Sequence, residues 1–344
     1  MFYQCPKCKN IWQYFLPKCP HCFLELKRIE SKKAKVISVS KVNIPSIFHL
    51  KVPYFVLLLE DENKNKWPQK SEREYKIGEN LNYETKKDKN AVSIWKIKYD
   101  ILEGIERTIE FLGGIELGSN SKVLILPTLK KATHSFFAEN TSIEFLNATI
   151  EYLIKRKVKR ENIKVCSQVF DESEIEVLTK KSGFLKICQK FKICLFDLSK
   201  GEFIEKNVGK FRFFVSKEVF ESDLILNLPI LKKNEASATE NIFKFLKREN
   251  YLALSYLYSK KEIFENLKKV LPEILTIGDA NFVQDENGIV RYFNLIFCSF
   301  NAQNLDRVFL EVFNFSKLPE ILKNVKLNEI EILGRKIEEI KIYP

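Results

Sequence analysis

Four cysteines near the start of the chain have the residue type and spacing to hold a metal ion. Two residues separate Cys5 from Cys8, ten residues follow Cys8, and the same short spacing recurs between Cys19 and Cys22. Two residues between cysteines let a tight turn aim both sulfurs at one point, and two facing turns supply a tetrahedral shell of four thiolates. This shell suits Zn²⁺ and leaves no open coordination position, so we expect a structural zinc site.

The sequence leaves two alternatives to zinc at these cysteines. The four sulfurs could bind a single iron ion, or the cysteines could pair in disulfides. The N-terminus lacks a charged start and a long apolar stretch, and no apolar run reaches the ~20 residues that a membrane span needs. We therefore expect a cytoplasmic protein that does not enter a membrane. Reducing conditions there disfavour disulfides, so zinc is preferred, with iron as the alternative. The chain has no C-x-x-C-x-x-C-x-x-x-C run, so it encodes no ferredoxin-type iron–sulfur cluster.

The remaining cysteines and the histidine of the second pair follow weaker patterns. His21 lies between Cys19 and Cys22, and we expect it to be an exposed loop side chain rather than a ligand. Four further cysteines lie among apolar neighbours and are expected to be buried, inert thiols: Cys166, Cys188, Cys194 and Cys298.

The helices and strands that position these residues are expected to form several domains. The chain has 344 residues, which exceeds the ~250–300 that one hydrophobic core usually holds. We expect a rubredoxin-like metal ribbon over residues 1–26 and a small OB-like β-barrel over 27–85. The polar stretch at 86–92 reads as a linker, and an α/β domain follows over 93–344.

Short strands dominate the second part. Residues 34–42 alternate apolar and polar side chains, which is the period of a half-buried strand. We expect a second strand over 52–60, a third near Lys66 and Trp67, and a fourth around 81–84. Several short strands within about fifty residues favour a small barrel.

Beyond the linker, compact apolar runs alternate with segments of helical spacing. The run at 122–126 predicts a strand, and residues 142–155 predict a helix with Ser142 as its N-cap. This alternation predicts an α/β fold with a mainly parallel sheet. Further strands are expected at 163–166, 193–196, 224–228, 274–277 and 295–297, and further helices at 173–181, 238–246, 261–270 and 305–313.

The first 85 residues resemble the rubredoxin-like zinc ribbon plus OB-fold proteins, the domain-of-unknown-function family 35. The resemblance rests on the two Cys-Pro-x-Cys pairs, on Trp12, and on the stretches VPYFV at 52–56 and YKIGE at 75–79. It implies a ribbon packed on a small barrel, and a partner such as a thiolase-type or other acyl-CoA-processing enzyme. The glycine that usually follows each cysteine pair is replaced here by Lys9 and Phe23.

The α/β domain resembles the domain-of-unknown-function family 362. Four stretches carry this resemblance in the same order and at similar separations: Val123–Leu129, Ser222–Lys232, Leu275–Ala280 and Asn294–Asp306. Where the family usually has Lys-Pro-Asn and Lys-Thr-His, this chain has LPT at 126–128 and KKN at 232–234. A lysine, an asparagine and a histidine that could carry charge or proton transfer are therefore absent.

Five polar residues of this domain remain candidates for a site. Lys232 and Asp279 are candidate catalytic residues, and His134, Asp223 and Asp306 are candidate ligand-binding residues. The four other than His134 lie at the end of an expected strand or the start of an expected helix, where ligand sites gather in open α/β sheets. The alternative is that the aspartates cap turns, that Lys232 is solvated and that His134 is an ordinary loop residue.

Three functions are compatible with the sequence. The favoured one is an accessory protein that docks on a partner enzyme, and the second is an enzyme in which Lys232 neutralises an anionic small molecule beside Asp279. The third is single-stranded nucleic-acid binding, in which Trp12, Tyr14 and Trp67 would stack on bases. Residues 1–90 hold 18 Lys and Arg against 10 Asp and Glu, which fits the third function, but the excess is nearly all lysine and the domain lacks an arginine-rich strand.

Overall fold

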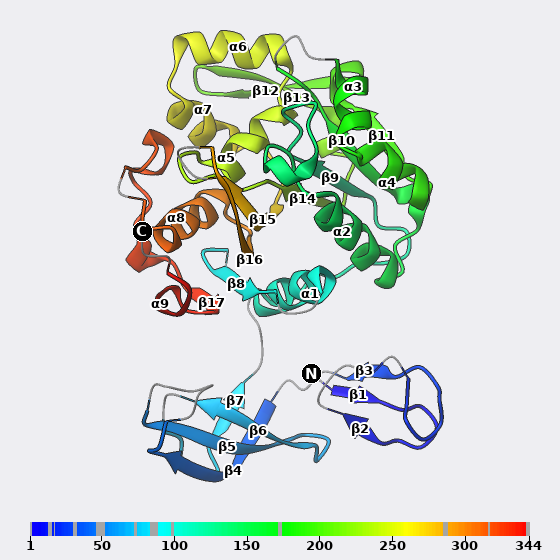
Figure 1. The fold of residues 1–344 in the computed structure, drawn as a ribbon, viewed down its shortest axis with the longest axis vertical. Helices are drawn as coiled ribbons and strands as arrows, with labels where there is room; N and C mark the ends of the chain where they lie inside the picture. The colour runs from blue at the N-terminus through cyan, green and yellow to red at the C-terminus, as the bar shows by residue number, and fades with distance from the viewer. Residues whose placement is uncertain are drawn as a thin grey trace. The chain divides into compact units, whose positions relative to one another are not determined.

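The chain divides into two compact units, Met1–Lys86 and Lys87–Pro344, which Figure 1 colours from blue to red along the sequence. The division falls within the expected linker at 86–92. The computed structural model describes residues 2–12, 16, 18–29, 33–45, 52–71, 74–82, 89–97, 100–170, 174–284, 288–315 and 317–341. The candidate stacking residue Tyr14 lies outside these ranges.

The first unit begins with a small antiparallel ribbon. Its central strand, β1 (Phe2–Gln4), pairs with β2 (Ile11–Trp12) on one side and with β3 (Lys27–Ile29) on the other. The first cysteine pair lies in the turn between β1 and β2, and the second lies before β3.

A four-stranded antiparallel sheet forms the rest of the first unit. Its strands lie in the order β6 (Lys66–Ser71), β5 (Tyr54–Asp61), β4 (Lys33–Val42) and β7 (Asn80–Asn82). The strands occur where the alternating pattern predicts them, although residues 83 and 84 of the expected fourth strand lie outside the described residues. The described pairings leave β6 and β7 at opposite edges, so closure into an OB-like barrel stays a prediction.

An aromatic contact helps to pack the ribbon on this sheet. Phe2 meets Trp67 edge to face, with 4.9 Å between the ring centroids, and both rings are buried with Val36, Leu57 and Leu59. Trp67 therefore belongs to the core of the first unit and is not available to stack on a nucleic-acid base.

The second unit is built on a large sheet of mainly parallel strands, as the sequence predicts. In order across the sheet, the described strands are β11 (Cys194–Asp197), β10 (Ile163–Ser167), β9 (Val123–Pro127), β14 (Leu224–Leu228), β15 (Ile274–Gln284), β16 (Val290–Ser299), β8 (Val92–Lys96) and β17 (Ile332–Gly334). The first five strands in this order are mutually parallel. Strand β16 runs antiparallel to both of its neighbours, and β17 pairs in parallel with β8.

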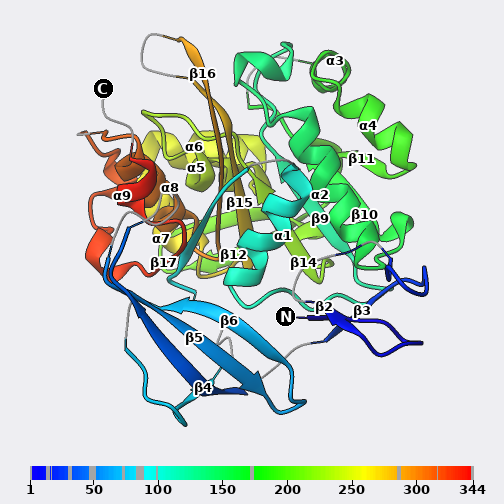
Figure 2. The same cartoon turned by 60° about the horizontal axis from the view of Figure 1, so that its bottom comes forward.

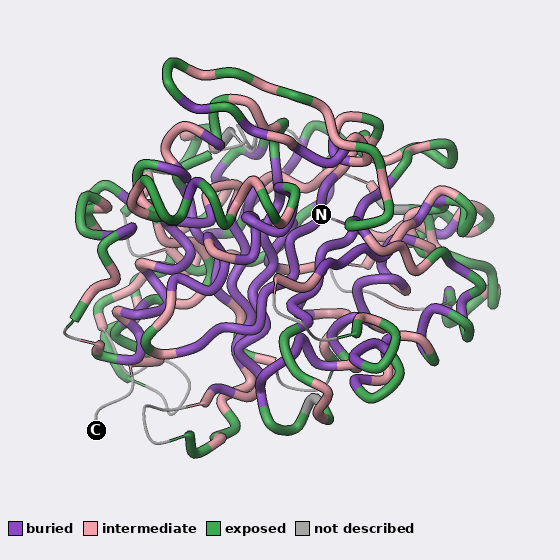
Figure 3. The backbone as a smooth tube through the Cα atoms, turned by 90° about the horizontal axis from the view of Figure 1, so that it is seen from above, coloured by how far each residue is buried: buried purple, intermediate pink, exposed green. Residues whose placement is uncertain are grey.

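Helices cover both faces of this sheet (Figure 2), and the central strands are buried along their length (Figure 3). In β9, Val123 and Ile125 pack into one hydrophobic core, while Leu124 and Leu126 pack into the other. The first face carries α1 (Ile101–Phe111), α2 (Ile143–Lys155), α3 (Ile175–Lys181) and α4 (Phe184–Phe191). The second carries α5 (Ser237–Ile242), α6 (Arg248–Leu257), α7 (Lys260–Leu267), α8 (Ala302–Val312), α9 (Ile337–Ile340) and the hairpin of β12 (Phe203–Val208) and β13 (Phe211–Ser216). None of the described helices is long and apolar enough to cross a membrane.

The strand order reverses between β9 and β14. From β9 the chain moves outward through β10 to β11, and it then returns to place β14 and β15 on the other side of β9. In open α/β sheets, ligands bind outside the carboxyl ends of the strands at such a reversal. A ligand site is therefore expected at this edge of the sheet.

Candidate metal centre and edge pocket

The four N-terminal cysteines converge on one point. Their sulfur atoms all lie within 4.8 Å of one another, and the Sγ atoms of Cys8 and Cys19 are 3.6 Å apart. A tetrahedral ion with metal–sulfur bonds of about 2.3 Å places its sulfurs about 3.8 Å apart. The donor set therefore fits a four-coordinate metal ion.

Two turns of the same geometry present these sulfurs. In the first, the Lys9 N–H donates to the Cys5 carbonyl oxygen at 3.0 Å; in the second, the Phe23 N–H donates to the Cys19 carbonyl oxygen at 2.8 Å. Lys9 has φ +61° and Phe23 has φ +55°, in the left-handed region that glycine adopts most easily. The turns thus keep their shape without the glycines, at a cost in backbone strain.

The charge state of the cluster also favours a cation. Against the opposing effect of desolvation, backbone N–H groups of Cys8 and Lys7 lower the pKa of the Cys5 thiol to about 6. The Asn10 backbone lowers the pKa of Cys8, but desolvation and the three neighbouring sulfurs outweigh it and raise that pKa to about 12. Four adjacent sulfurs therefore resist becoming thiolates together unless a positive ion lies between them.

The other cysteines are not part of this cluster. Cys166, Cys188 and Cys298 are buried as predicted, and burial raises the pKa of each thiol. The prediction was wrong for Cys194, which is exposed because it begins β11 at the edge of the sheet. His21 is exposed, with its ring 6.3 Å from that of Trp12.

A cavity of about 500 Å³, here named the edge pocket, opens at the reversal in strand order. The loops after β9, β10 and β14 line it, together with α5 and the start of α6. Its lining residues are Thr128, Leu129, Lys130, Lys131, Gln168, Val169, Phe170, Ile230, Ser237, Glu240, Asn241, Lys244 and Tyr251.

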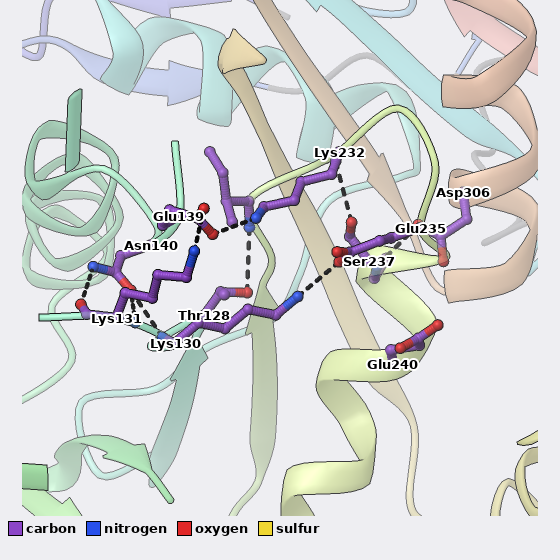
Figure 4. Close-up of polar contacts among 12 residues, drawn as sticks. Thr128, Lys130, Lys131, Glu139, Asn140, Lys232, Glu235, Ser237, Glu240 and Asp306 are labelled. Carbon is purple, nitrogen blue, oxygen red and sulfur yellow. Dashed lines mark hydrogen bonds and ion pairs between the residues drawn. The ribbon is translucent and has the colours of Figure 1, made fainter. Parts of the chain in front are cut away.

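Three lysines contribute positive charge to the edge pocket, two of them shown in Figure 4. Lys130 pairs with Glu235 at 2.7 Å. Lys131 pairs with Glu139 at 2.9 Å. Lys244 is buried, and its ammonium donates to the Leu129 carbonyl oxygen at 3.0 Å.

The loop that carries Lys130 and Lys131 is held by Asn140 (Figure 4). The Asn140 side-chain oxygen accepts from the backbone N–H groups of Lys130 at 2.8 Å and Lys131 at 3.2 Å. Its amide nitrogen donates to the carbonyl oxygens of Lys131 at 2.8 Å and Thr133 at 3.1 Å. One buried side chain therefore fixes both lysine backbones.

Lys232 is buried rather than solvated, and its ammonium forms a hydrogen-bonded ion pair with Glu139. Glu139 also binds Lys131, so one carboxylate joins the end of β14 to the loop after β9. Burial opposes ionisation of Glu139, but the hydrogen bonds from Lys232 and Lys131 hold its pKa below the usual value.

Asp279 lies in β15 and binds the far end of the same loop, at Ser142. Its Oδ2 accepts from the Ser142 N–H at 2.9 Å and from the Ser142 hydroxyl at 2.6 Å, and its Oδ1 accepts from the Asn281 N–H at 3.1 Å. Ser142 also caps α2, as predicted, by accepting from the Phe145 N–H. Asp279 thus fastens the start of α2 to β15, and burial raises the pKa of its carboxyl.

Asp306 is buried within α8 and binds the first turn of α5. Its Oδ1 accepts from the Ala238 N–H at 2.9 Å, and its Oδ2 accepts from the Thr239 N–H at 2.8 Å and hydroxyl at 2.7 Å. Burial raises the pKa of Asp306 to about 7, against the opposing effect of these hydrogen bonds.

The other two candidates make local contacts. Asp223 accepts from the Lys122 N–H at 2.8 Å, and exposed His134 accepts from the Phe136 N–H at 3.2 Å through Nδ1. The structure therefore brings Lys232 and Asp279 to one loop, through Glu139 and Ser142, but neither lines the edge pocket.

The residues that do line the edge pocket were not among the candidates predicted from the sequence. Lys244 carries a detectable signal, because it is a single charge within the apolar run from Ile242 to Leu246. Gln168 directly follows β10, at the end of a strand, where ligand sites gather in open α/β sheets.

The comparisons with known proteins concern different parts of the chain. No curated protein matches it. A solved structure described as an Ltp2–ChsH2(DUF35) aldolase matches with 22% identity and a TM-score of 0.20, over 24% of this chain and 68% of that one. A protein of unknown function from the DUF35 family of Sulfolobus solfataricus matches with 23% identity and a TM-score of 0.17, over 22% of this chain and 61% of that one.

One family match covers most of the second unit. Residues 123–311 match the family described as a domain of unknown function, DUF362. They include the edge pocket with all its lining residues, as well as Lys232, Asp279 and Asp306. Because this match covers more than half of the 344 residues, the chain belongs to the DUF362 family.

Proposed function

We propose that the second unit binds an anionic small molecule in the edge pocket. The observation that carries this proposal is the presence of three lysines on one cavity at the reversal of the sheet: Lys130, Lys131 and Lys244. Cavities at this place in α/β sheets are the usual ligand sites, and clustered positive charge on their walls raises the local concentration of anions.

The lysine pairs differ in how readily they can exchange partners. The side chains of Lys130 and Glu235 are 42% and 33% exposed, and such exposed pairs contribute little to stability. An incoming anion can therefore replace Glu235 beside Lys130. Lys232 and Glu139 are buried, so we propose that they hold the loop rather than touch the ligand. Asp279, bound to Ser142, is proposed to do the same.

The test is calorimetric titration of the full chain with phosphate, pyrophosphate and citrate. We expect at least one of these anions to bind, and Lys130→Gln to weaken it about tenfold, because charge-assisted hydrogen bonds are worth about 1.5–3 kcal/mol. Lys155→Gln is the matched control, since Lys155 is equally exposed and pairs with Glu106 at 2.8 Å away from the pocket. Absence of binding by all three anions, or equal weakening by both substitutions, contradicts the proposal.

We propose Zn²⁺ as the ion held by the cysteine cluster, with a structural role. Four thiolates fill a tetrahedral shell, so no position is left for a substrate or a water molecule. The first unit buries only a small core around Val36, Leu57 and Leu59, and the metal would add folding energy to the ribbon.

We also propose that the first unit docks on a partner protein. Phe23 is 74% exposed although it occupies a left-handed position, and Leu24 beside it is also exposed. An exposed aromatic ring beside a second exposed apolar side chain is typical of an anchor at a protein–protein contact. The resemblance of residues 1–85 to family 35 favours a thiolase-type or other acyl-CoA-processing enzyme as the partner. Nucleic-acid binding is less favoured, because the ring of Trp67 is buried.

A further inference from the structure

Gln168 leaves one hydrogen-bonding atom unused at the wall of the edge pocket. It is fully buried, and its amide nitrogen donates to the carbonyl oxygens of Lys244 and Leu246. Because both amide hydrogens are taken, the orientation of the side chain is fixed. Its Oε1 is buried and has no partner within the described residues. A buried acceptor without a donor is costly, and Gln168 lines the edge pocket, so a ligand N–H or O–H group that reached this atom would satisfy it.

A pair of stacked aromatic rings lines the edge pocket together with Gln168. The rings of Phe170 and Tyr251 both line the edge pocket and stack with centroids 4.7 Å apart and planes inclined by 20°. Phe243 packs against Tyr251 at 5.1 Å, and Arg248 donates to the Phe170 carbonyl oxygen at 3.0 Å. These contacts hold the stacked pair in place, and a planar ligand ring could extend the stack at Phe170.

The positive charge comes from the other side of the pocket. Lys130 and Lys131 lie on the loop after β9, whereas Gln168 and Phe170 follow β10. Lys244 connects the two sides, because its carbonyl oxygen binds Gln168 while its ammonium reaches the Leu129 carbonyl oxygen. The pocket therefore has a cationic end and an end with an amide oxygen and aromatic rings.

Resting on the proposed anion binding, we infer that the ligand is a nucleotide whose phosphates meet the lysines and whose base lies along Phe170 and donates to Gln168 Oε1. The cavity of about 500 Å³ falls within the usual range for small-molecule sites, about 300–1,000 Å³. The same chemistry is offered by a free nucleotide and by the nucleotide end of a larger cofactor.

The test compares ADP with pyrophosphate by calorimetric titration of the full chain. We expect ADP to bind at least about tenfold more tightly, because the stacked base adds to the phosphate contacts. Phe170→Leu should remove most of this advantage while leaving pyrophosphate binding unchanged. Phe136→Leu, at an exposed ring that does not line the pocket, is the control and should have no effect.

The amide contact is tested by changing the ligand, because substitution of Gln168 would also release two backbone carbonyls. Purine riboside diphosphate lacks the amino group of adenine, and we expect it to bind about tenfold more weakly than ADP. Equal binding of the two would overturn the contact to Gln168. An NAD titration separates the sources: tighter binding than ADP assigns the larger cofactor, and weaker binding assigns the free nucleotide.

Two outcomes separate this inference from the proposal on which it rests. If pyrophosphate and ADP bind with equal affinity and both lose affinity in Lys130→Gln, the pocket is an anion site and the inference of a nucleotide ligand is wrong. If neither ADP nor any of the simple anions binds, both the inference and the proposed function are wrong.

Discussion

At the scale of single residues, Lys9 and Phe23 show how the cysteine turns tolerate a missing glycine. Both residues hold a positive φ, and the hydrogen bonds that close the two turns are made by their own backbone N–H groups. A bound metal, rather than local preference, would then keep these backbones in place.

Lys9→Gly should therefore increase the affinity of the four cysteines for zinc. Removing the side chain relieves a strain of about 1–2 kcal/mol, partly offset by about 0.4–1 kcal/mol from the freer unfolded chain. We expect zinc affinity to rise by up to about fifteenfold in a chelator competition assay. Lys7→Gly is the control, since Lys7 is not among the residues with positive φ and should gain nothing. Weaker binding after Lys9→Gly would show that the lysine side chain itself supports the site.

The metal content gives the second prediction at this scale. Elemental analysis should find about one zinc ion per chain, and Cys5→Ser or Cys22→Ser should release it and unfold the ribbon. Cys194→Ser should leave the zinc content unchanged, because Cys194 lies outside the cluster. A ribbon that stays folded without metal, judged by Trp12 fluorescence, would contradict a structural role.

The cysteine site could be predicted from the sequence because all four ligands lie within 18 residues and their spacing itself encodes the geometry. The edge pocket could not. Lys130, Gln168 and Lys244 are far apart in the sequence and meet only because β9, β10 and β14 are neighbours in the sheet. Lys232 has a polar partner, Glu139, that also lies far away along the chain.

At the scale of elements, Asp306 joins two helices. Asp306→Asn leaves a single side-chain oxygen for three donors, so at least one buried N–H or O–H group of α5 loses its acceptor. We expect a loss of about 1–3 kcal/mol in the free energy of unfolding, measured with urea and circular dichroism. Asp100→Asn is the control, because asparagine caps a helix as well as aspartate does. An equal effect of both substitutions would contradict the assigned role.

The raised pKa of Asp306 also predicts a pH dependence. Its pKa rises from about 3.9 in the unfolded chain to about 7 in the folded one, so between these values the folded state binds more protons. The contribution of this group to stability therefore falls as the pH rises through that window. We expect the stability difference between the wild type and Asp306→Asn to narrow between pH 5 and pH 8. A difference that widens would place the folded pKa below the unfolded one.

Long-range contacts also explain why some helices and strands differ from those expected from the sequence. The expected helix at 238–246 is divided into α5 and a tighter turn at Phe243–Phe245. The carbonyl oxygens of Lys244 and Leu246 bind Gln168, from a strand end about eighty residues earlier. The hairpin of β12 and β13 and helix α6 were not predicted either. Strands such as β9 and β14 were predicted because burial on both faces makes them almost entirely apolar.

At the scale of the whole molecule, the two units are proposed to perform different tasks. Phe23→Gly tests the docking task without harming the metal site, since glycine suits a positive φ. We expect the wild-type chain to retain a partner enzyme on purification from its native cell, and Phe23→Gly to lose that partner at unchanged zinc content. The same partner should stay bound to Lys130→Gln, which alters only the edge pocket. Equal retention by all three proteins would show that Phe23 is not the anchor.

The contacts of Asn140 and Glu139 have a consequence for the rate at which a ligand enters. The loop that carries Lys130 and Lys131 is held in place by folding itself, through the amide of Asn140 and the buried pair of Glu139 and Lys232. Association then needs little additional ordering of the protein. We expect a single-phase approach to equilibrium whose observed rate increases linearly with ligand concentration, without the plateau that a slow closing step produces.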